Sequence, residues 1–342
     1  MTTWVLAGDV GGTKTNLAIY RFEQPRKATL AREETFPSRE YPGLEEIVHE
    51  FLGKEREPLA AAAFGIAGPV FDGRVNVTNL PWQIETGSLA REIGCDDVRL
   101  MNDLETTAYG ALFLDASELH VLNEGVPRKT HRVVVAAGTG LGQAILFWDG
   151  ERFRPSATEG GHASFAPRNE REMALLRFLL RRFDRVSWER VVSGPGLFHI
   201  FEYLDQEEGL PVSPEVRERM EIEDPSAVIG KAAVAESCVC CAAAVDLFVS
   251  LYGAQAANLV LSVMAQGGVY LGGGIVTKLL PRVTAGGFLE AFRAVGRFGP
   301  LVAETPVQII LNPKASLLGA AEVALDLVLE HRAAHAAGSF GR

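Results

Sequence analysis

Residues 8–15 read Gly-Asp-Val-Gly-Gly-Thr-Lys-Thr and come directly after the short apolar segment 3–7. This pattern predicts a strand that ends at Gly8-Asp9, a tight glycine turn, and a returning strand over residues 16–21. Glycines in such a turn allow several backbone N–H groups to point at one anion. We therefore interpret the segment as a phosphate-binding turn made of Gly8, Asp9, Val10, Gly11, Gly12 and Thr13.

Two side chains add to the chemistry of this turn. The Thr13 hydroxyl is a further donor for a phosphate, and Asp9 at the strand end can hold a hydrated Mg²⁺ through water. Better known phosphate motifs do not fit. No Gly-Lys pair is followed by Ser or Thr, and Gln143 and Thr277 stand where a dinucleotide fingerprint needs its third glycine. An ordinary glycine hairpin remains the alternative.

A second, similar turn opens the other half of the chain. Residues 132–137 form an apolar strand pattern, Gly138-Thr139-Gly140 is a tight turn, and residues 141–148 return. The repeat predicts two related α/β domains that face each other, with a small-molecule site in the inter-domain cleft. Two such turns could hold a polyphosphate from both sides. Further along the chain, Gly272, Gly273 and Gly274 predict a flat backbone platform for the base and ribose of a nucleotide.

Strand and helix patterns alternate over most of the chain. We expect strands over residues 60–67, 98–101, 268–271 and 307–311, and helices over residues 44–52, 104–114, 170–183 and 315–331. Residues 204–225 have the composition of a surface connection with a short helix. Residues 227–265 predict two helices with a break near Asp246 or Gly253, and the tail from residue 333 is expected to fray.

Asn102 and Asp103 stand where the predicted strand 98–101 passes into a helix. A carboxylate at this position is well placed as a general base that takes a proton from a substrate hydroxyl while its oxygen attacks phosphorus. The alternative is a helix cap, because Asn and Asp are common N-cap residues. The nearby phosphate turns favour the general base.

Two further segments carry polar side chains beside glycines. Glu159 and His162 flank Gly160-Gly161, and Glu189 precedes the segment Val191-Val192-Ser193-Gly194. Carboxylates and imidazoles recognise sugar hydroxyls well, because each hydroxyl both donates and accepts a hydrogen bond. A metal site at Glu159 and His162 is the rival interpretation, but zinc needs further ligands and none stands close in the sequence.

Composition excludes several classes of protein. The 342 residues are 47% hydrophobic and 22% charged, which predicts globular domains and excludes a disordered chain or a fibre. The net charge of −10 disfavours a general nucleic-acid binder. Residues 247–277 carry no charge but are broken by glycines and amides, so we expect a buried helix and strand and no membrane span.

The cysteines point to a reducing compartment. Cys238, Cys240 and Cys241 are too close together to pair with one another and match no zinc spacing, so we expect three small buried side chains on a helix. Since residues 1–4 do not start a signal peptide, we expect a cytoplasmic protein.

The ordered set of these motifs resembles the bacterial glucokinase family, within the hexokinase/actin-like superfamily. The matching segments are residues 8–13, 65–69, 79–82, 102–103, 138–142, 159–162, 189–196, 271–275 and 315–320. The resemblance implies a two-domain actin-like ATPase (ribonuclease H-like) fold. It also implies a small α/β domain of residues 1–113 plus 314–342, a large α/β domain of residues 114–313, and a homodimer.

The resemblance further implies phosphorylation of the 6-hydroxyl of glucose by Mg-ATP. It gives Asp103 the role of general base, places Asn102, Asp103, Glu159, His162 and Glu189 on the sugar, and assigns the 8–13 turn to the nucleotide phosphates. The related ROK sugar kinases carry a cysteine-rich zinc loop after a histidine, and this sequence does not match it, so we expect no zinc.

Three alternatives to a glucokinase stay open. The same side chains could accept several hexoses, which would make the protein a hexose kinase of broader specificity. A non-catalytic sugar sensor on the same fold would not need both a base and phosphate turns. An actin-like or chaperone-like ATPase would not need the sugar-binding side chains, and its ATP hydrolysis would not require added sugar.

Overall fold

The computed structural model describes residues 2–23, 27–53 and 58–339, with backbone alone for residues 335–339. The chain forms two compact units. The first contains Met1–Asp115, Arg154–Ala157 and Asn312–Arg342, and the second contains Ala116–Phe153 and Thr158–Leu311. Whether domains begin and end at the predicted residues 113 and 314 stays a prediction.

The first unit is built on a five-stranded sheet with the order β3-β2-β1-β4-β8. Its strands are β1 (Thr3–Val10), β2 (Lys14–Phe22), β3 (Ala28–Pro37), β4 (Leu59–Ile66) and β8 (Val98–Asn102). β1, β2 and β3 are antiparallel neighbours, whereas β1, β4 and β8 run parallel. A small second sheet contains β5 (Val70–Phe71), β6 (Arg74–Asn76) and β7 (Gln83–Glu85).

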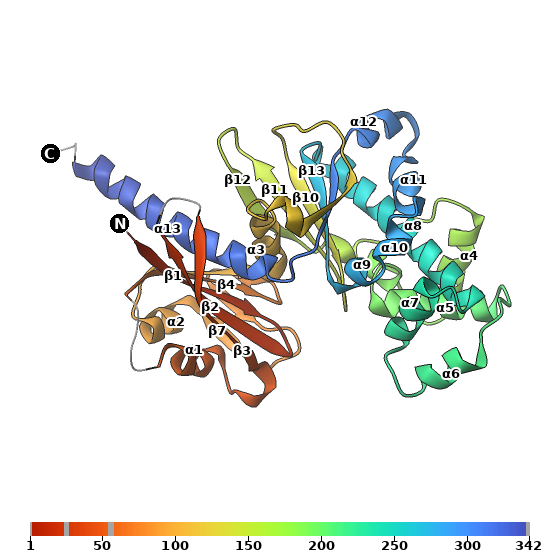
Figure 1. The fold of residues 1–342 in the computed structure, drawn as a ribbon, viewed down its shortest axis with the longest axis horizontal. Coiled ribbons are helices and arrows are strands. Elements are labelled where there is room, and N and C mark those ends of the chain that lie inside the picture. The colour runs from red at the N-terminus through yellow and green to blue at the C-terminus, as the bar shows by residue number, and fades with distance from the viewer. Residues whose placement is uncertain (1, 24–26, 54–57, 340–342) are drawn as a thin grey trace. The chain divides into compact units, whose positions relative to one another are not determined.

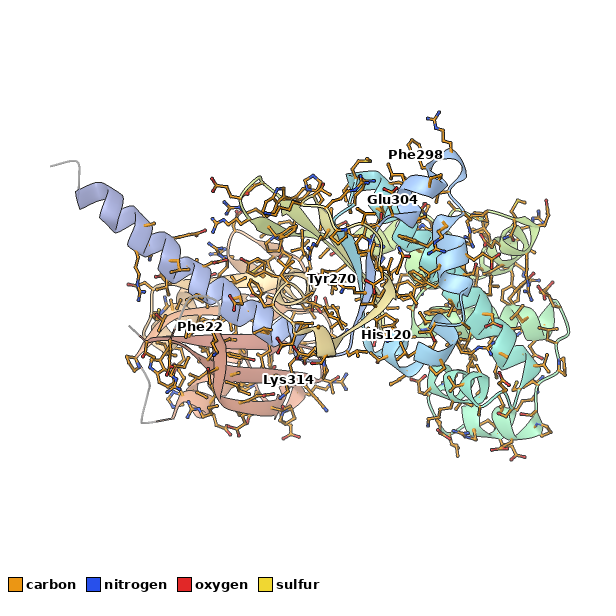
Figure 2. The ribbon with its side chains drawn as sticks, turned by 45° about the horizontal axis from the view of Figure 1, so that its top comes forward. Phe22, His120, Tyr270, Phe298, Glu304 and Lys314 are labelled. Carbon is orange, nitrogen blue, oxygen red and sulfur yellow. The ribbon has the colours of Figure 1, made fainter. Side chains whose placement is uncertain are left out.

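Helices cover this sheet in two groups (Figure 1). α1 (Leu44–Leu52) and α2 (Thr86–Ile93) share a hydrophobic core with side chains of β1, β2 and β4. α3 (Asp103–Gly110) packs on the C-terminal helix α13 (Ala315–Ser339), which also contacts β1 and β4. Just before α13, Lys314 (Figure 2) pairs with Glu33 of β3, with Nζ 2.6 Å from Oε2, which holds the start of this helix on the sheet.

The second unit repeats the strand order of the first. Its six-stranded sheet has the order β12-β11-β10-β13-β14-β9, so that a hairpin is again followed by parallel strands. The strands are β9 (Leu119–Asn123), β10 (Arg132–Ala137), β11 (Leu141–Trp148), β12 (Phe153–Thr158), β13 (Gly268–Gly272) and β14 (Val307–Ile310). The two related halves predicted from the glycine turns therefore share one topology.

Nine helices belong to this unit within the described residues. They are α4 (Glu170–Leu179), α5 (Gly194–Gln206), α6 (Pro214–Met220), α7 (Pro225–Val234), α8 (Val239–Val263), α9 (Gly274–Lys278), α10 (Leu280–Val283), α11 (Gly287–Arg293) and α12 (Gly299–Ala303). α8 runs through the centre of the core and contacts α5, α7 and α11. It is the described helix long and apolar enough for a membrane span, but 72% of its apolar segment is buried, which is typical of a core helix.

The predicted elements differ from the observed ones mainly at their ends. α1, β10 and β11 have the predicted bounds. The first strand does not end at Gly8-Asp9 but continues to Val10, because these residues pair with β2 and β4. α3 and α4 end earlier than expected. The prediction of a frayed tail from residue 333 is wrong as far as Ser339, where α13 ends, and residues 340–342 lie outside the described residues.

The predicted break near Asp246 or Gly253 is also wrong. The break lies between α7 and α8, where Glu236 has a φ of 53° and Cys238 caps α8. Gly253 lies inside the helix. Glycine stands at this position because a Cβ there would lie 2.3 Å from the Phe288 carbonyl oxygen. The glycine thus permits close packing of α8 on α11 and does not interrupt the helix.

The three clustered cysteines are buried at the start of α8, as predicted. Cys240 donates to the Phe201 carbonyl oxygen at 3.8 Å, and Cys238 accepts from the Cys241 N–H at 3.3 Å. Burial raises the pKa of the Cys240 thiol to about 12 and also raises the pKa of Cys241. Thiols that stay protonated at neutral pH are poor nucleophiles and poor metal ligands.

Candidate active site

The first glycine turn joins β1 and β2 through residues 11–13. Its backbone is fixed by Ser38, whose hydroxyl donates to the Gly11 carbonyl oxygen at 2.8 Å and whose N–H donates to the Thr13 carbonyl oxygen at 3.1 Å. Thr13 is exposed and Gly12 is partly exposed. Ser38 therefore fixes the turn through two of its carbonyl groups, and other backbone groups of the turn can face a ligand.

Gly8 and Val10 lie within β1 and not in the turn itself. A Cβ at Gly8 would lie 2.2 Å from Cδ1 of Phe64, so the glycine here makes room for the core. The Val10 side chain is buried. Their predicted contact with phosphate stays a prediction, and packing already explains why a glycine stands at position 8.

Asp9 is the acidic residue at this end of the sheet. Its Oδ1 accepts a hydrogen bond from the Ser316 hydroxyl at 2.8 Å, and its Oδ2 accepts from Asn16 Nδ2 at 3.4 Å. Burial raises the pKa of Asp9, and these two hydrogen bonds act against the increase. The carboxylate is thus held in one orientation by α13 and β2.

Ser316 is a site residue to which the sequence analysis gave no role. Its hydroxyl donates to Asp9 and also lies 2.9 Å from Thr106 Oγ1. Thr106 Oγ1 in turn donates to the Asp103 carbonyl oxygen at 2.9 Å. This chain of hydroxyls links Asp9 to the helix that begins at Asp103. The signal was present in the matched segment 315–320, but the partners lie more than 200 positions away in the sequence.

Asn102 and Asp103 stand at the carboxyl end of β8. Asn102 is the N-cap of α3: its Oδ1 accepts from the Leu104 N–H at 2.9 Å, while Glu105 accepts from the Asn102 N–H at 2.9 Å. Asn102 Nδ2 also donates to the Gly68 carbonyl oxygen at 3.2 Å. The cap role that competed with a general base thus belongs to Asn102, although Asp103 Oδ1 also lies 2.9 Å from the Leu104 N–H.

In the second unit, the turn 138–140 is closed by a Gly138 N–H donating to the Gly140 carbonyl oxygen at 2.9 Å. The Gly194 N–H at the start of α5 donates to the Gly138 carbonyl oxygen at 2.8 Å, and Ser226 donates to that of Gly194 at 2.7 Å. Thr139 is exposed. As in the first turn, neighbouring segments hold the carbonyl groups and fix the conformation.

Glu189 lies directly against this second turn. Its Oε2 accepts from the Leu141 N–H at 3.0 Å, and a Cβ at Gly140 would lie 2.6 Å from the same oxygen. Two segments that sequence analysis selected separately are therefore in contact. The missing side chain at Gly140 is what allows the carboxylate to approach the turn.

Glu159 precedes a 3₁₀ turn, Gly160–His162, which follows β12 and ends with His162. The Glu159 Oε2 and His162 Nε2 atoms are 3.9 Å apart, and both side chains are exposed. A Cβ at Gly161 would lie 2.0 Å from the Leu141 carbonyl oxygen, so the loop packs on the start of β11. Within the described ranges no three His, Cys, Asp or Glu side chains are grouped to hold a metal, so the metal interpretation of this pair gains no support.

A cavity of about 870 Å³ opens beside the second turn. It is lined by residues of the turn, of α5, of α7 and of α9, among them Gly138, Thr139, Gly194, Ser226, Lys231 and Gly274. Most of its wall is apolar, as is usual for a small-molecule site. Of the three predicted platform glycines only Gly274 lines it, since Gly272 is buried in β13 and a Cβ at Gly273 would lie 2.2 Å from the Ala137 carbonyl oxygen.

The structure thus brings the predicted residues together in two groups. In the first unit, one group lies at the carboxyl ends of the parallel strands and is joined through Ser316. It contains the turn 11–13, Asp9 and Asn102-Asp103. In the second unit, the turn 138–140, Glu189 and the loop 159–162 contact one another next to the cavity.

Comparison with known proteins identifies relatives along the whole chain. A family model described as Glucokinase matches residues 6–327. The chain is 39% identical to a glucokinase of Nostoc punctiforme over 340 residues, which cover 95% of this chain and all of the relative. It is 40% identical to a glucokinase of a further Nostoc strain over 341 residues, again with 95% and 100% covered.

Solved structures of glucokinases share the fold. A glucokinase from an Antarctic psychrotroph is 26% identical with a TM-score of 0.82, covering 94% of this chain and 99% of that one. A Balamuthia mandrillaris glucokinase in complex with glucose is 22% identical with a TM-score of 0.76, with 94% of each chain covered. A ROK family glucokinase of Streptomyces griseus with glucose and AMPPNP is 20% identical with a TM-score of 0.61, covering 94% and 99%. The predicted two-domain actin-like ATPase fold is confirmed.

Proposed function

This chain belongs to the glucokinase family, and on that premise we propose that it transfers the γ-phosphoryl group of ATP to the 6-hydroxyl of glucose. One observation of the structure carries the proposal. β1, β4 and β8 run parallel, with Asp9 beside Gly65 and Ile66 beside Asn102. Adjacent strands are about 4.8 Å apart, and β4 lies between β1 and β8. The candidate phosphate-binding turn and the candidate base therefore lie about 10 Å from each other at the carboxyl ends of these strands. That spacing suits a polyphosphate and an acceptor hydroxyl in line.

Asp103 is the proposed general base. It orients the 6-hydroxyl and accepts its proton as that oxygen attacks the γ-phosphorus, while ADP leaves with the bridging oxygen. Two features support this role. Asn102 is the residue that caps α3, and Asp103 stands at the positive end of the helix, which favours the carboxylate form.

Five side chains bind the sugar in this proposal. Asn102, Asp103, Glu159, His162 and Glu189 contact its hydroxyls, as the family resemblance implies. Support comes from the contact of Glu189 with the turn 138–140, and from the exposure of Glu159 and His162 on one short loop. Each of these groups can donate or accept in the manner that a sugar hydroxyl requires.

Mg-ATP is the proposed phosphoryl donor. The turns 8–13 and 138–140 would bind its phosphates, and the cavity beside Gly274 would take its base and ribose. A single carboxylate that is already oriented by Ser316 and Asn16 fits a Mg²⁺ held mainly by water and phosphate, so Asp9 would hold it through water. When bound there, Mg²⁺ would supply neutralisation of the negative charge on the phosphates of the donor.

A coupled assay for glucose 6-phosphate with Mg-ATP and a panel of hexoses tests the proposal. Turnover on glucose that is lost without Mg²⁺ is the expected result. Comparable kcat/KM on mannose, glucosamine or fructose would favour the hexose kinase of broader specificity. Glucose binding without turnover on any sugar would favour the sensor, and ATP hydrolysis without sugar would favour the ATPase.

Two further properties are proposed from the sequence. We propose a homodimer, which the family resemblance implies, and a cytoplasmic location, which the spacing of the cysteines favours. Light scattering on the purified protein across a concentration series tests the first, since a mass near 37 kDa at all concentrations would contradict it. Cell fractionation tests the second.

A further inference from the structure

We propose that Gln143 is a positioning residue for the sugar-binding loop 159–162, and that its buried side-chain amide binds the backbone of this loop when glucose binds. The inference rests on the proposed function, in which Glu159 and His162 contact the sugar. Gln143 and the whole loop belong to the second unit.

Gln143 is a buried polar side chain in a largely apolar strand. It stands in β11, directly opposite Val135 of β10, and is 1% exposed. Within the described residues, neither its Nε2 nor its Oε1 has a hydrogen-bond partner. A buried amide that leaves both its donor and its acceptor unused destabilises a fold, whereas an apolar side chain of the same size does not. Core packing therefore does not explain why a glutamine stands here.

The amide of Gln143 lies against the first glycine of the loop. A Cβ at Gly160 would lie 2.3 Å from Gln143 Oε1 and 3.2 Å from its Cδ, so the missing side chain at Gly160 leaves the space that the amide occupies. The unused donor and acceptor are thus next to the backbone that carries Glu159 and His162.

The His162 end of the loop is held by a neighbouring segment. The His162 carbonyl oxygen accepts from Arg185 Nη2 at 2.9 Å, and the Ala163 carbonyl oxygen accepts from the Trp188 N–H at 2.9 Å. These bonds tie this end of the loop to the residues that lead to Glu189. His162 is therefore held in place by the protein itself.

The hydrogen bonds at the Glu159 end are local. The Gly160 N–H donates to the Thr158 hydroxyl at 3.0 Å, and the Glu159 side chain is 70% exposed. A Glu159 carboxylate that moves onto a sugar hydroxyl carries the adjacent backbone with it, and glycine at position 160 permits this change. The Gln143 amide has a donor and an acceptor beside that backbone and can bind it in the new position.

Gln143→Met tests the inference, because methionine keeps the unbranched shape and removes the amide. Gln143→Leu is a second variant with the same purpose. We expect the Kd for glucose, measured by calorimetry without ATP, and the KM for glucose to rise about tenfold, with the KM for Mg-ATP within about twofold of wild type. The free energy of unfolding without glucose, measured by urea denaturation, should stay the same or rise, since an unsatisfied group is removed. Lower stability with an unchanged Kd for glucose would show a purely structural role and overturn the inference.

The side-chain amide itself gives a second readout. In protein labelled with ¹⁵N at glutamine, the signal of Gln143 Nε2 is the one that is missing from Gln143→Met. We expect this signal to shift when glucose is added and to stay in place when a non-hydrolysable ATP analogue is added alone with Mg²⁺. An unchanged signal at saturating glucose would mean that the amide keeps the same partners with and without the sugar, and would overturn the inference.

Thr305→Val is the matched control. Thr305 is fully buried, and in the described part of the chain its hydroxyl also has no hydrogen-bond partner. It lies in the same unit just before β14, which β10 and β13 separate from β11 in the sheet. The variant should keep the wild-type Kd for glucose. An equal rise in Kd in Thr305→Val would contradict a specific role of Gln143, whereas wild-type protein that binds no hexose would contradict the proposed function and this inference with it.

Discussion

Asp9 is a buried carboxyl group at the candidate site, and the effect of its ionisation on the stability of the fold can be measured. Because burial raises its folded-state pKa above the unfolded value, the folded protein binds the proton more tightly, and ionisation of Asp9 destabilises the fold as pH rises through that range. Asparagine removes this charge and can keep the hydrogen bond from Ser316, and it loses only the longer 3.4 Å contact with Asn16.

We therefore predict that Asp9→Asn raises the melting temperature at pH 7 while it strongly reduces turnover. Because the pKa of Asp9 is raised, the gain in stability should shrink as pH falls and protonation removes the charge from wild type as well. Thermal denaturation of both proteins across this pH range checks the prediction. A variant that is less stable at pH 7, or equally stabilised at every pH, would contradict it.

Local sequence selects candidate residues from the pattern of their own segment. The turn glycines, Asn102-Asp103 and Glu159-His162 were each identified from neighbours a few positions away. Ser316 was missed, because its contact with Asp9 joins two residues that are distant in sequence. A serine in a helix has no local pattern that reveals such a contact.

At the scale of elements, the approach of α13 to α3 is close enough to depend on two glycines. A Cβ at Gly319 would lie 1.8 Å from the Thr106 carbonyl oxygen, and a Cβ at Gly110 would lie 1.9 Å from that of Ala315. Backbone atoms cannot rotate away as side chains can. The contact places Ser316 beside Asp9, so this helix pair supports the site as well as the fold.

We predict that Gly319→Ala lowers the free energy of unfolding by about 1–3 kcal/mol and reduces activity in the fraction that remains folded. Gly287→Ala is the control, since Gly287 begins α11 with nothing within 4 Å of a Cβ, and it should be neutral or slightly stabilising. Urea denaturation measures both. An unchanged stability of Gly319→Ala would show that the two helices can separate without cost.

Elements were predictable where one face is consistently apolar. α1 buries Leu44, Ile47, Val48, Phe51 and Leu52 and has the predicted bounds. β3 was missed because it is a largely exposed edge strand, in which Phe36 is the buried side chain. The break of the long helical segment was misplaced because Gly253 serves tertiary packing, which the local sequence does not show.

On the scale of the molecule, the repeat of one hairpin with parallel strands in both units is the basis of the functional account. Each hairpin turn is held through its carbonyl groups, by Ser38 in the first unit and by Gly194 in the second. The sequence revealed the repeat because its turns need glycine. It could not reveal the cavity beside Gly274, whose walls come from four separated segments.

Turnover of Asp103→Asn on glucose is the most direct test of this account. The variant is compared with wild type in the coupled assay, after calorimetry has shown that it still binds glucose and ATP, and with Asp72→Asn in the exposed β5–β6 turn as a control. The account predicts that kcat falls by about 10²–10⁴ in Asp103→Asn while both ligands bind and the control keeps its activity. Turnover within a few-fold of wild type would contradict Asp103 as the base.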